Sequence, residues 1–273
     1  MMLGVSVGGI APVLGSADPW ADRVTRYDPG SNAQFGYDNP LVAIGQPERS
    51  TFETTGGGAF TSVVSPFNPA FETNEIVSIG EGGSLTVEFD EPITDSPAHP
   101  FGVDLIIFGN GGFIDDDFPH GRASAPIGTF GMDAMRVLVS DDGTNFVDLG
   151  LHTEGLFPAM GYLDGGAYDA VPGQVPTDFT RPVDPALTLN DFKGLSLAQI
   201  RALYDGSGGG TGIDIAGSGL SAVTHVRIEA PDDGDPGKTS NVEIDAFAAV
   251  PEPGAAAMWL ALTYLGVAFR RRL

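Results

Sequence analysis

The chain has 273 residues, of which 36 are acidic and 13 basic, so its formal net charge is −23. This charge repels nucleic acid and anionic lipid, which argues against both as partners of the body of the protein. Cysteine is absent, which excludes a disulfide framework and thiol chemistry. The chain has 39 Gly and 21 Pro with little helical periodicity, and this composition favours an all-β body with many turns.

Residues 1–17 have features of an export signal. They are apolar and end in Gly15-Ser16-Ala17 before Asp18, the small-residue pattern of a signal-peptide cleavage site. The segment lacks the basic residues with which such signals begin, so a misassigned start and a disordered N-terminus are alternatives. We predict a signal peptide over 1–17, chiefly because the C-terminal tail described below requires export.

The body, residues 18–249, starts with a loop-rich stretch that we expect to cover one face of the core. Residues 84–89 then alternate strictly, which places Leu85, Val87 and Phe89 inward. Residues 103–108 are apolar enough for a central strand. The remaining predicted strands are 75–79, 135–139, 146–149, 223–229 and 242–248, with Val242, Ile244, Ala246 and Ala248 facing away from Phe247 in the last of them.

Two other parts of the body depart from the strand pattern. Residues 151–191 contain five prolines and predict a long irregular section, which in a compact domain is usually functional or poorly ordered. Residues 196–204 predict one short helix, with Ser196 as its cap and Gln199 at the capping-box position. We therefore predict a jelly-roll-like β-sandwich with one short helix over residues 18–249.

Oxygen-rich clusters are the candidate metal sites. Calcium takes six to eight oxygen ligands from a bendable loop, and acidic loops supply them. The candidate ligands are Asp115, Asp116 and Asp117 after a central strand, Asp232, Asp233 and Asp235 between the last two strands, and Asp141, Asp142 and Asn145 on a predicted Asp-Gly hairpin. None completes an EF-hand, because the loop that begins at Asp233 has Ile244 at its twelfth place. Solvated acidic loops, or Asx turns in the hairpin, are the alternatives.

The tail, residues 250–273, has three parts in a fixed order. Val250, Pro251, Glu252 and Pro253 come first, an uncharged run over 255–269 follows, and Arg270, Arg271 and Arg272 close the chain. A run of this kind in lipid forms a helix, because lipid offers backbone groups no other partner. At about 22 Å it is shorter than the hydrocarbon core of about 30 Å, and arginines at its end favour the cytoplasmic side.

This order of motifs resembles the PEP-CTERM tail of bacterial exported proteins. The resemblance implies that a membrane enzyme, exosortase, recognises and cleaves the tail, and that the remainder reaches the cell surface or extracellular matrix. A permanent membrane anchor and a buried C-terminal helix are the alternatives.

The body resembles surface proteins with a galactose-binding-like, discoidin-type jelly roll. The resemblance rests on the stretches 79–89, 104–108, 137–146, 213–215, 226–228 and 243–247, and is sharpest at the Ser140-Asp141-Asp142-Gly143 hairpin. It implies glycan binding through end loops and a structural calcium ion.

No catalytic motif stands out in the sequence. The four histidines lack zinc spacing, and no Gly-x-Ser-x-Gly elbow is present. The sequence therefore predicts a non-catalytic exported surface or matrix protein that binds glycan or calcium. The alternative is a secreted glycan-active hydrolase, since that chemistry needs only two carboxylates about 5–10 Å apart. A tethered domain with a purely structural role is a third hypothesis.

Overall fold

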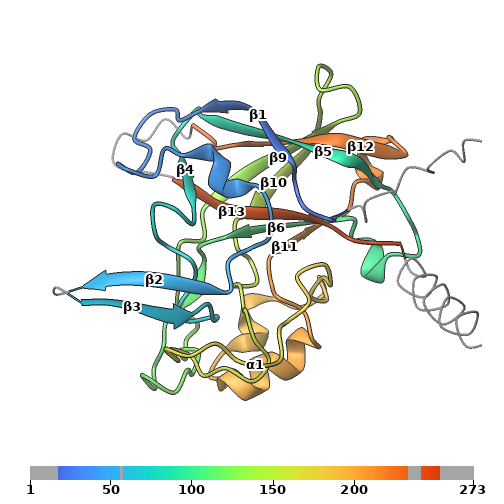
Figure 1. The fold of residues 1–273 in the computed structure, drawn as a ribbon. Helices are drawn as coiled ribbons and strands as arrows, with labels where there is room; N and C mark the ends of the chain where they lie inside the picture. Colours follow the sequence, from blue (N-terminus) through green and yellow to red (C-terminus); the bar gives the residue numbers. More distant parts are fainter. Residues whose placement is uncertain (1–17, 56–57, 233–240, 253–273) are drawn as a thin grey trace, which may run out of the picture.

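The computed structural model describes residues 18–55, 58–232 and 241–252 (Figure 1). The predicted signal peptide, the apolar run 255–269 and the terminal arginines lie outside these residues. The main elements are β1 (Arg23–Asp28), β2 (Ser50–Thr55), β3 (Gly58–Val63), β4 (Val77–Ile79), β5 (Ser84–Thr94), β6 (Leu105–Gly109), β7 (Gly112–Phe113), β8 (Thr129–Phe130), β9 (Ala134–Ser140), β10 (Val147–Thr153), α1 (Leu197–Tyr204), β11 (Thr211–Ile213), β12 (Ala222–Glu229) and β13 (Val242–Ala249). Short 3₁₀ helices lie at Pro40–Ala43, Pro100–Gly102, Leu189–Phe192 and Ala216–Ser218.

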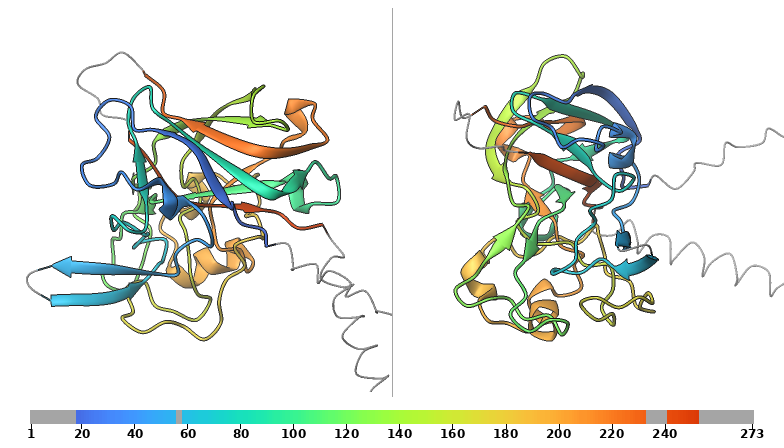
Figure 2. Two further views of the ribbon diagram at one scale, coloured as in Figure 1. Left: turned by 45° about the horizontal axis from the view of Figure 1, so that its top comes forward. Right: turned by 90° about the vertical axis from the view of Figure 1, so that its left-hand side faces the viewer.

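Two antiparallel sheets form a sandwich (Figures 1 and 2). One sheet has the order β1-β5-β12-β9-β10 and the other β11-β6-β13-β4. Apolar side chains from both sheets fill the space between them, among them Ile79, Leu85, Val137, Val226 and Ile244, each fully buried. The prediction of an all-β sandwich with one short helix is confirmed.

The alternation predicted for 84–89 is present in β5. Leu85, Val87 and Phe89 are buried in the sandwich core. The strand runs on to Thr94, beyond its predicted end, because it pairs with β12 again after an irregularity in register. Thr86 lies on the outer face, yet it is buried beneath the Arg227 side chain, whose Nε donates to the Thr86 hydroxyl at 3.1 Å.

The prediction for the faces of β13 was wrong at Phe247. The register shifts between Ile244 and Ala246, which is a bulge that reverses the alternation in the second half of the strand. Phe247 therefore packs in the sandwich core with Val242 and Ile244 instead of facing away from them.

The central position predicted for 103–108 is confirmed by β6, in which every residue is buried. Leu105 and Ile107 point into the sandwich core, whereas Ile106 and Phe108 point to a second cluster on the far side of the sheet. The smaller sheet is thus covered on both faces. Because both faces of β6 are buried, its sequence is continuously apolar.

The irregular section and α1 form a further packed region beneath the sandwich (Figure 1). Its core is aromatic: the Phe192 ring lies 5.3 Å from that of Phe113 and 5.9 Å from those of Phe157 and Tyr204, centroid to centroid. The predicted cap of α1 is confirmed, because Ser196 and Gln199 form a capping box. Neither α1 nor any 3₁₀ helix in the described part of the chain has the length and hydropathy that a membrane crossing needs.

The segment before residue 75 contains elements that the sequence pattern did not predict. β1 pairs with β5 at the edge of the larger sheet, and the β2–β3 hairpin projects away from the sandwich (Figure 2). β1 reads Arg-Val-Thr-Arg-Tyr-Asp, and its polar residues face solvent, as is typical of an edge strand.

Candidate functional site

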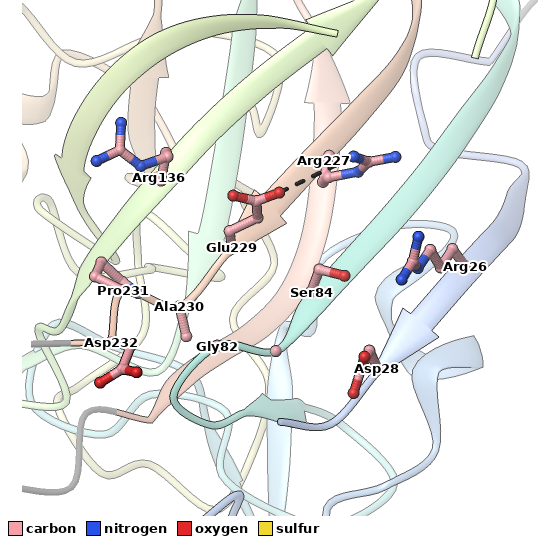
Figure 3. Close-up of a pocket in the computed structure, with 11 residues that line it drawn as sticks. Arg26, Asp28, Gly82, Ser84, Arg136, Arg227, Glu229, Ala230, Pro231 and Asp232 are labelled. Atoms are coloured by element: carbon pink, nitrogen blue, oxygen red, sulfur yellow. Dashed lines mark ion pairs between the residues drawn. The ribbon is translucent and has the colours of Figure 1, made fainter. Parts of the chain in front are cut away.

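A polar groove lies on the outer face of the five-stranded sheet (Figure 3). Strand register builds it in two rows. Asp28, Ser84, Glu229 and Arg136 occupy one row across β1, β5, β12 and β9, because each is paired with the next. Arg26, Thr86 and Arg227 form the neighbouring row. Since strand side chains alternate, all of these residues share the face opposite the core.

Contacts within the sheet hold two of the groove's arginines in place. The guanidinium of Arg227 lies 3.7 Å from the centroid of the Phe146 ring and 4.0 Å from a Glu229 oxygen. Arg136 donates to Asp148 at 2.6 Å. Arg26 is exposed, and no described carboxylate forms an ion pair with it.

The groove has a volume of about 410 Å³ and a lining of guanidinium, carboxylate and hydroxyl groups. Gly82, Gly83 and the segment 230–232 close one end. Among the described residues that line the groove there is no aromatic ring, so they offer no platform to an apolar sugar face. Guanidinium groups donate in a planar fork that matches a carboxylate, whereas carboxylates and Ser84 accept from hydroxyl groups. The groove therefore suits a hydroxylated ligand, and Arg26 is the guanidinium that a carboxylate of such a ligand could reach without displacing a described ion pair.

A second candidate site is an acidic centre at one end of the sandwich. It consists of Asp133 before β9, Glu154 after β10 and Glu243 in β13. One carboxylate oxygen from each residue lies within 4.8 Å of the corresponding oxygens of the other two. β9 and β10 belong to the larger sheet and β13 to the smaller, so the acidic centre joins the two sheets.

Backbone amides position the innermost carboxylate of the acidic centre. Glu154 is fully buried, and its two oxygens accept from the N–H of Asn110 at 3.2 Å and of Glu243 at 2.7 Å. A side chain at position 109 would collide with it, since a Cβ on Gly109 would lie 2.5 Å from Glu154. Glycine at the end of β6 is therefore required for this carboxylate to enter the interior.

Burial and repulsion from neighbouring carboxylates disfavour the charged forms of Glu154 and Glu243. Burial, with the Glu243 charge as the second cause, raises the pKa of Glu154 well above its ordinary value. Burial and the Asp133 charge raise the pKa of Glu243 to about 7, against a smaller opposing effect of Asn110. A divalent cation would relieve this repulsion, because it favours all three ionised forms.

The acidic centre fits calcium better than a softer metal. Its potential ligands are all oxygen, which hard cations prefer. The Asn110 side-chain oxygen is also buried there and has no hydrogen-bond partner. Asp133, Glu154 and Glu243 would hold the ion. This set was missed in the sequence, because each residue stands in a different segment and no short spacing relates them.

The three aspartates predicted after β6 serve mainly as acceptors within their own loop. Asp115 accepts from the N–H of Asp117 and of Arg122 at 2.8 and 2.9 Å, and Asp116 accepts from the Ala125 N–H at 3.2 Å. Asp117 lies 3.8 Å from the Arg122 guanidinium. Within the described ranges they form no group of three converging carboxylates. Calcium at Asp115, Asp116 and Asp117 stays a prediction.

The remaining acidic predictions divide among three places. Asp142 accepts from the backbone N–H of Thr144 and Asn145 and from the Asn145 amide, each at 2.8 Å. These bonds hold the pKa of Asp142 well below its usual range and make the hairpin an Asx turn. Asp232 lines the polar groove. Asp233 and Asp235 lie outside the described residues.

Another trio of acids is already engaged by the protein. Oxygens of Asp95, Asp104 and Asp214 also lie within 4.8 Å of one another. Asp104 is fully buried, and its oxygens accept from backbone amides and contact the His99 imidazole at 2.7 Å. We therefore assign no ion to this group.

The described part of the tail motif continues from β13. Val250 is buried, and its N–H donates to the Asp104 carbonyl at 2.8 Å. Pro251 and Glu252 follow at the surface. Pro253, Arg270, Arg271 and Arg272 lie outside the described residues.

No family model matches the chain, and no curated protein matches it. Among solved structures, it is similar to a pectin-binding carbohydrate-binding module. The identity is 10%, the match covers 65% of this chain and 73% of that chain, and the TM-score is 0.24. A similarity at this level carries no argument about ligand or mechanism.

Proposed function

We propose that this chain is a non-catalytic exported protein of the cell surface or extracellular matrix. Its C-terminal Pro-Glu-Pro, apolar and arginine segments are the sorting signal, and an exosortase-type membrane enzyme is the processing partner. Support for export comes from the sequence of residues 1–17 and 250–273. The sandwich is then the part that acts outside the cell, and its finer topology is that of a jelly roll.

The ligand we propose is a surface polysaccharide that carries carboxylate groups, bound in the polar groove. One observation supports this proposal: Arg26, Arg136 and Arg227 line one groove, beside Asp28, Glu229 and Asp232, in a chain in which acidic residues far outnumber basic ones. Long-range repulsion between the chain and a polyanion is screened at physiological salt, where the Debye length is about 8 Å. Contacts inside the groove are shorter than that and persist.

Calcium has a structural role in this proposal. Bound by Asp133, Glu154 and Glu243, it would link the ends of β9, β10 and β13 and so fasten the two sheets together. The ion would neutralise the buried carboxylates. It would thereby provide stabilisation of the kind that disulfides give many exported proteins.

A glycan-active hydrolase is the second candidate. The raised pKa of Glu243, about 7, is the observation that favours it, because a general acid must be protonated at working pH. Glu154 argues against it, since a fully buried carboxylate has no access to a sugar.

Affinity electrophoresis with the exported protein tests the proposed ligand. We expect retardation by alginate, a polymer of uronic acids, and none by neutral dextran at 0.15 M salt. Replacing both Arg26 and Arg136 with Gln should remove the retardation. Arg181→Gln, whose native side chain pairs with Asp205 away from the groove, is the control for a lost positive charge. Equal retardation of the double variant and the control would contradict the groove assignment.

The same mixtures separate binding from hydrolysis. A binding protein leaves the alginate chain length unchanged after prolonged incubation. Shortened chains, with shortening abolished by Glu243→Gln, would instead establish the hydrolase.

A further inference from the structure

The first residues of the tail motif are held against the sandwich. The Ala249 N–H donates to the Pro19 carbonyl at 2.7 Å and the Val250 N–H to the Asp104 carbonyl at 2.8 Å. Pro251 has no N–H, so this backbone pairing stops there. Among the described residues no backbone hydrogen bond reaches Glu252, so side chains make its contacts with the sandwich.

Two hydroxyl groups hold the Glu252 carboxylate. The Thr94 hydroxyl donates to one Glu252 carboxylate oxygen and the Ser96 hydroxyl to the other, each at 3.0 Å. Thr94 is the last residue of β5, and Ser96 follows two positions later on the same side of the extended chain. Each carboxylate oxygen thus has its own donor, and the two donors come from one short segment.

A buried histidine completes the contact. His99 is 3% exposed, and its Nδ1 lies 2.7 Å from an oxygen of the fully buried Asp104. That contact fixes the ring and leaves Nε2 without a hydrogen-bond partner, 3.7 Å from a Glu252 oxygen. A buried ring nitrogen with no other partner, directed at a carboxylate, indicates a site built for an anion.

Electrostatics agrees with the geometry. The hydrogen bonds from the Thr94 and Ser96 hydroxyls lower the pKa of Glu252, against a smaller opposing effect of burial. The contact thus favours the ionised form. About half of the Glu252 side chain stays exposed, so the carboxylate is held and can still be released.

We propose that Thr94, Ser96 and His99 form a carboxylate-binding site on the sandwich, that its ligand is Glu252 of the chain's own Pro-Glu-Pro motif, and that this contact slows removal of the tail. The second half rests on the proposed function, because it requires a processing enzyme. That enzyme must lift Glu252 from the sandwich before it can enclose the motif. The first half is a property of the chain alone.

The binding half is tested by carbon NMR of glutamate carboxyl groups in the full chain, held in detergent micelles. In the unaltered protein the Glu252 carboxyl should titrate below the ordinary range of glutamate. Replacing Thr94 with Val and Ser96 with Ala should return it to that range. Thr25→Val, which removes a hydroxyl on β1 that donates to a backbone carbonyl, is the matched control. Identical Glu252 titrations in all three proteins would overturn the site.

The regulatory half is tested by pulse-chase measurement of tail removal in the producing cell. The Glu252 side chain is about half exposed, so each hydrogen bond to it contributes at the low end of the usual range, and losing two of them should speed removal about threefold to tenfold. Equal rates in the double variant and the Thr25→Val control would overturn this half. Thr94→Val alone, with a smaller expected acceleration, replaces the double variant if that protein does not fold.

The two measurements separate the inference from the proposed function. If no tail is removed from any version, the sorting proposal fails and the regulatory half fails with it. The NMR titration then still decides whether the carboxylate-binding site exists.

Discussion

The acidic centre predicts how the stability of the metal-free protein changes with pH. The pKa of Glu243 is about 7 in the folded protein and 4.5 when unperturbed, so between these values the folded state binds more protons than the unfolded state. Stability then falls as pH rises through this window. For Glu243 alone, the free energy of unfolding is about 3 kcal/mol lower above pH 7 than it is well below pH 4.5. The raised pKa of Glu154 changes stability in the same direction.

Urea unfolding in the presence of EDTA, at pH 5 and pH 8, measures this effect. The net charge of the chain also lowers stability as pH rises, so the decisive quantity is the difference between the unaltered protein and Glu243→Gln. We expect Glu243→Gln to lose about 2.5 kcal/mol less stability than the unaltered protein between the two pH values. Glu91→Gln, which removes an exposed carboxylate elsewhere, should follow the unaltered protein.

Calcium extends the same experiment. Added at pH 8, it should restore stability to the unaltered protein and to Glu91→Gln, and have a much smaller effect on Glu243→Gln. At pH 5 its effect should be small throughout, because protons occupy the same oxygens. Equal pH dependence of the unaltered protein and Glu243→Gln would refute the electrostatic reasoning. If calcium stabilised neither the unaltered protein nor Glu91→Gln at pH 8, the metal assignment would be refuted.

Three further predictions concern the fold. Phe192→Ala removes a fully buried ring that contacts three others, and the free energy of unfolding in urea should fall by about 3–5 kcal/mol, with a loss below 1 kcal/mol contradicting the packing. Asp245→Asn should stabilise the protein at pH 8 and much less at pH 5, because burial and then the Glu48 charge raise the pKa of Asp245 well above its ordinary value, and ionisation is therefore costly only at higher pH. Equal effects of Asp245→Asn at both pH values would argue against a buried charge. Ser196→Ala should cost about 1 kcal/mol in the same assay by removing the cap of α1, and an unchanged midpoint would contradict the capping box.

Local patterns in the sequence were sufficient to predict several elements. Alternation alone identified the buried side of β5, since Leu85, Val87 and Phe89 share one face whatever strand lies beside them. Ser196 and Gln199 identified the start of α1, because a capping box depends only on residues three apart. The bulge in β13 was not predictable in this way, because it depends on pairing with β6.

The candidate sites depend on long-range pairing and were less accessible to sequence reasoning. Alternation in β12 places Arg227 and Glu229 on the outer face, and this much was readable. Their approach to Arg136 and Arg26 requires the strand order β1-β5-β12-β9, which no local pattern encodes. Glu154 and Glu243 likewise meet only when the ends of β10 and β13 come together. Asp115, in the acidic run that is conspicuous in the sequence, instead accepts hydrogen bonds from backbone N–H groups of its own loop.

The most direct test of the account is the intact mass of the protein recovered from the surface or medium of the cell that produces it. We predict a mass that lacks residues 1–17 and everything beyond the Pro-Glu-Pro segment. Such a mass would establish sorting by the tail and direct attention to the saccharide ligand of the polar groove. A protein that keeps its full C-terminus and remains in the inner membrane would contradict the account.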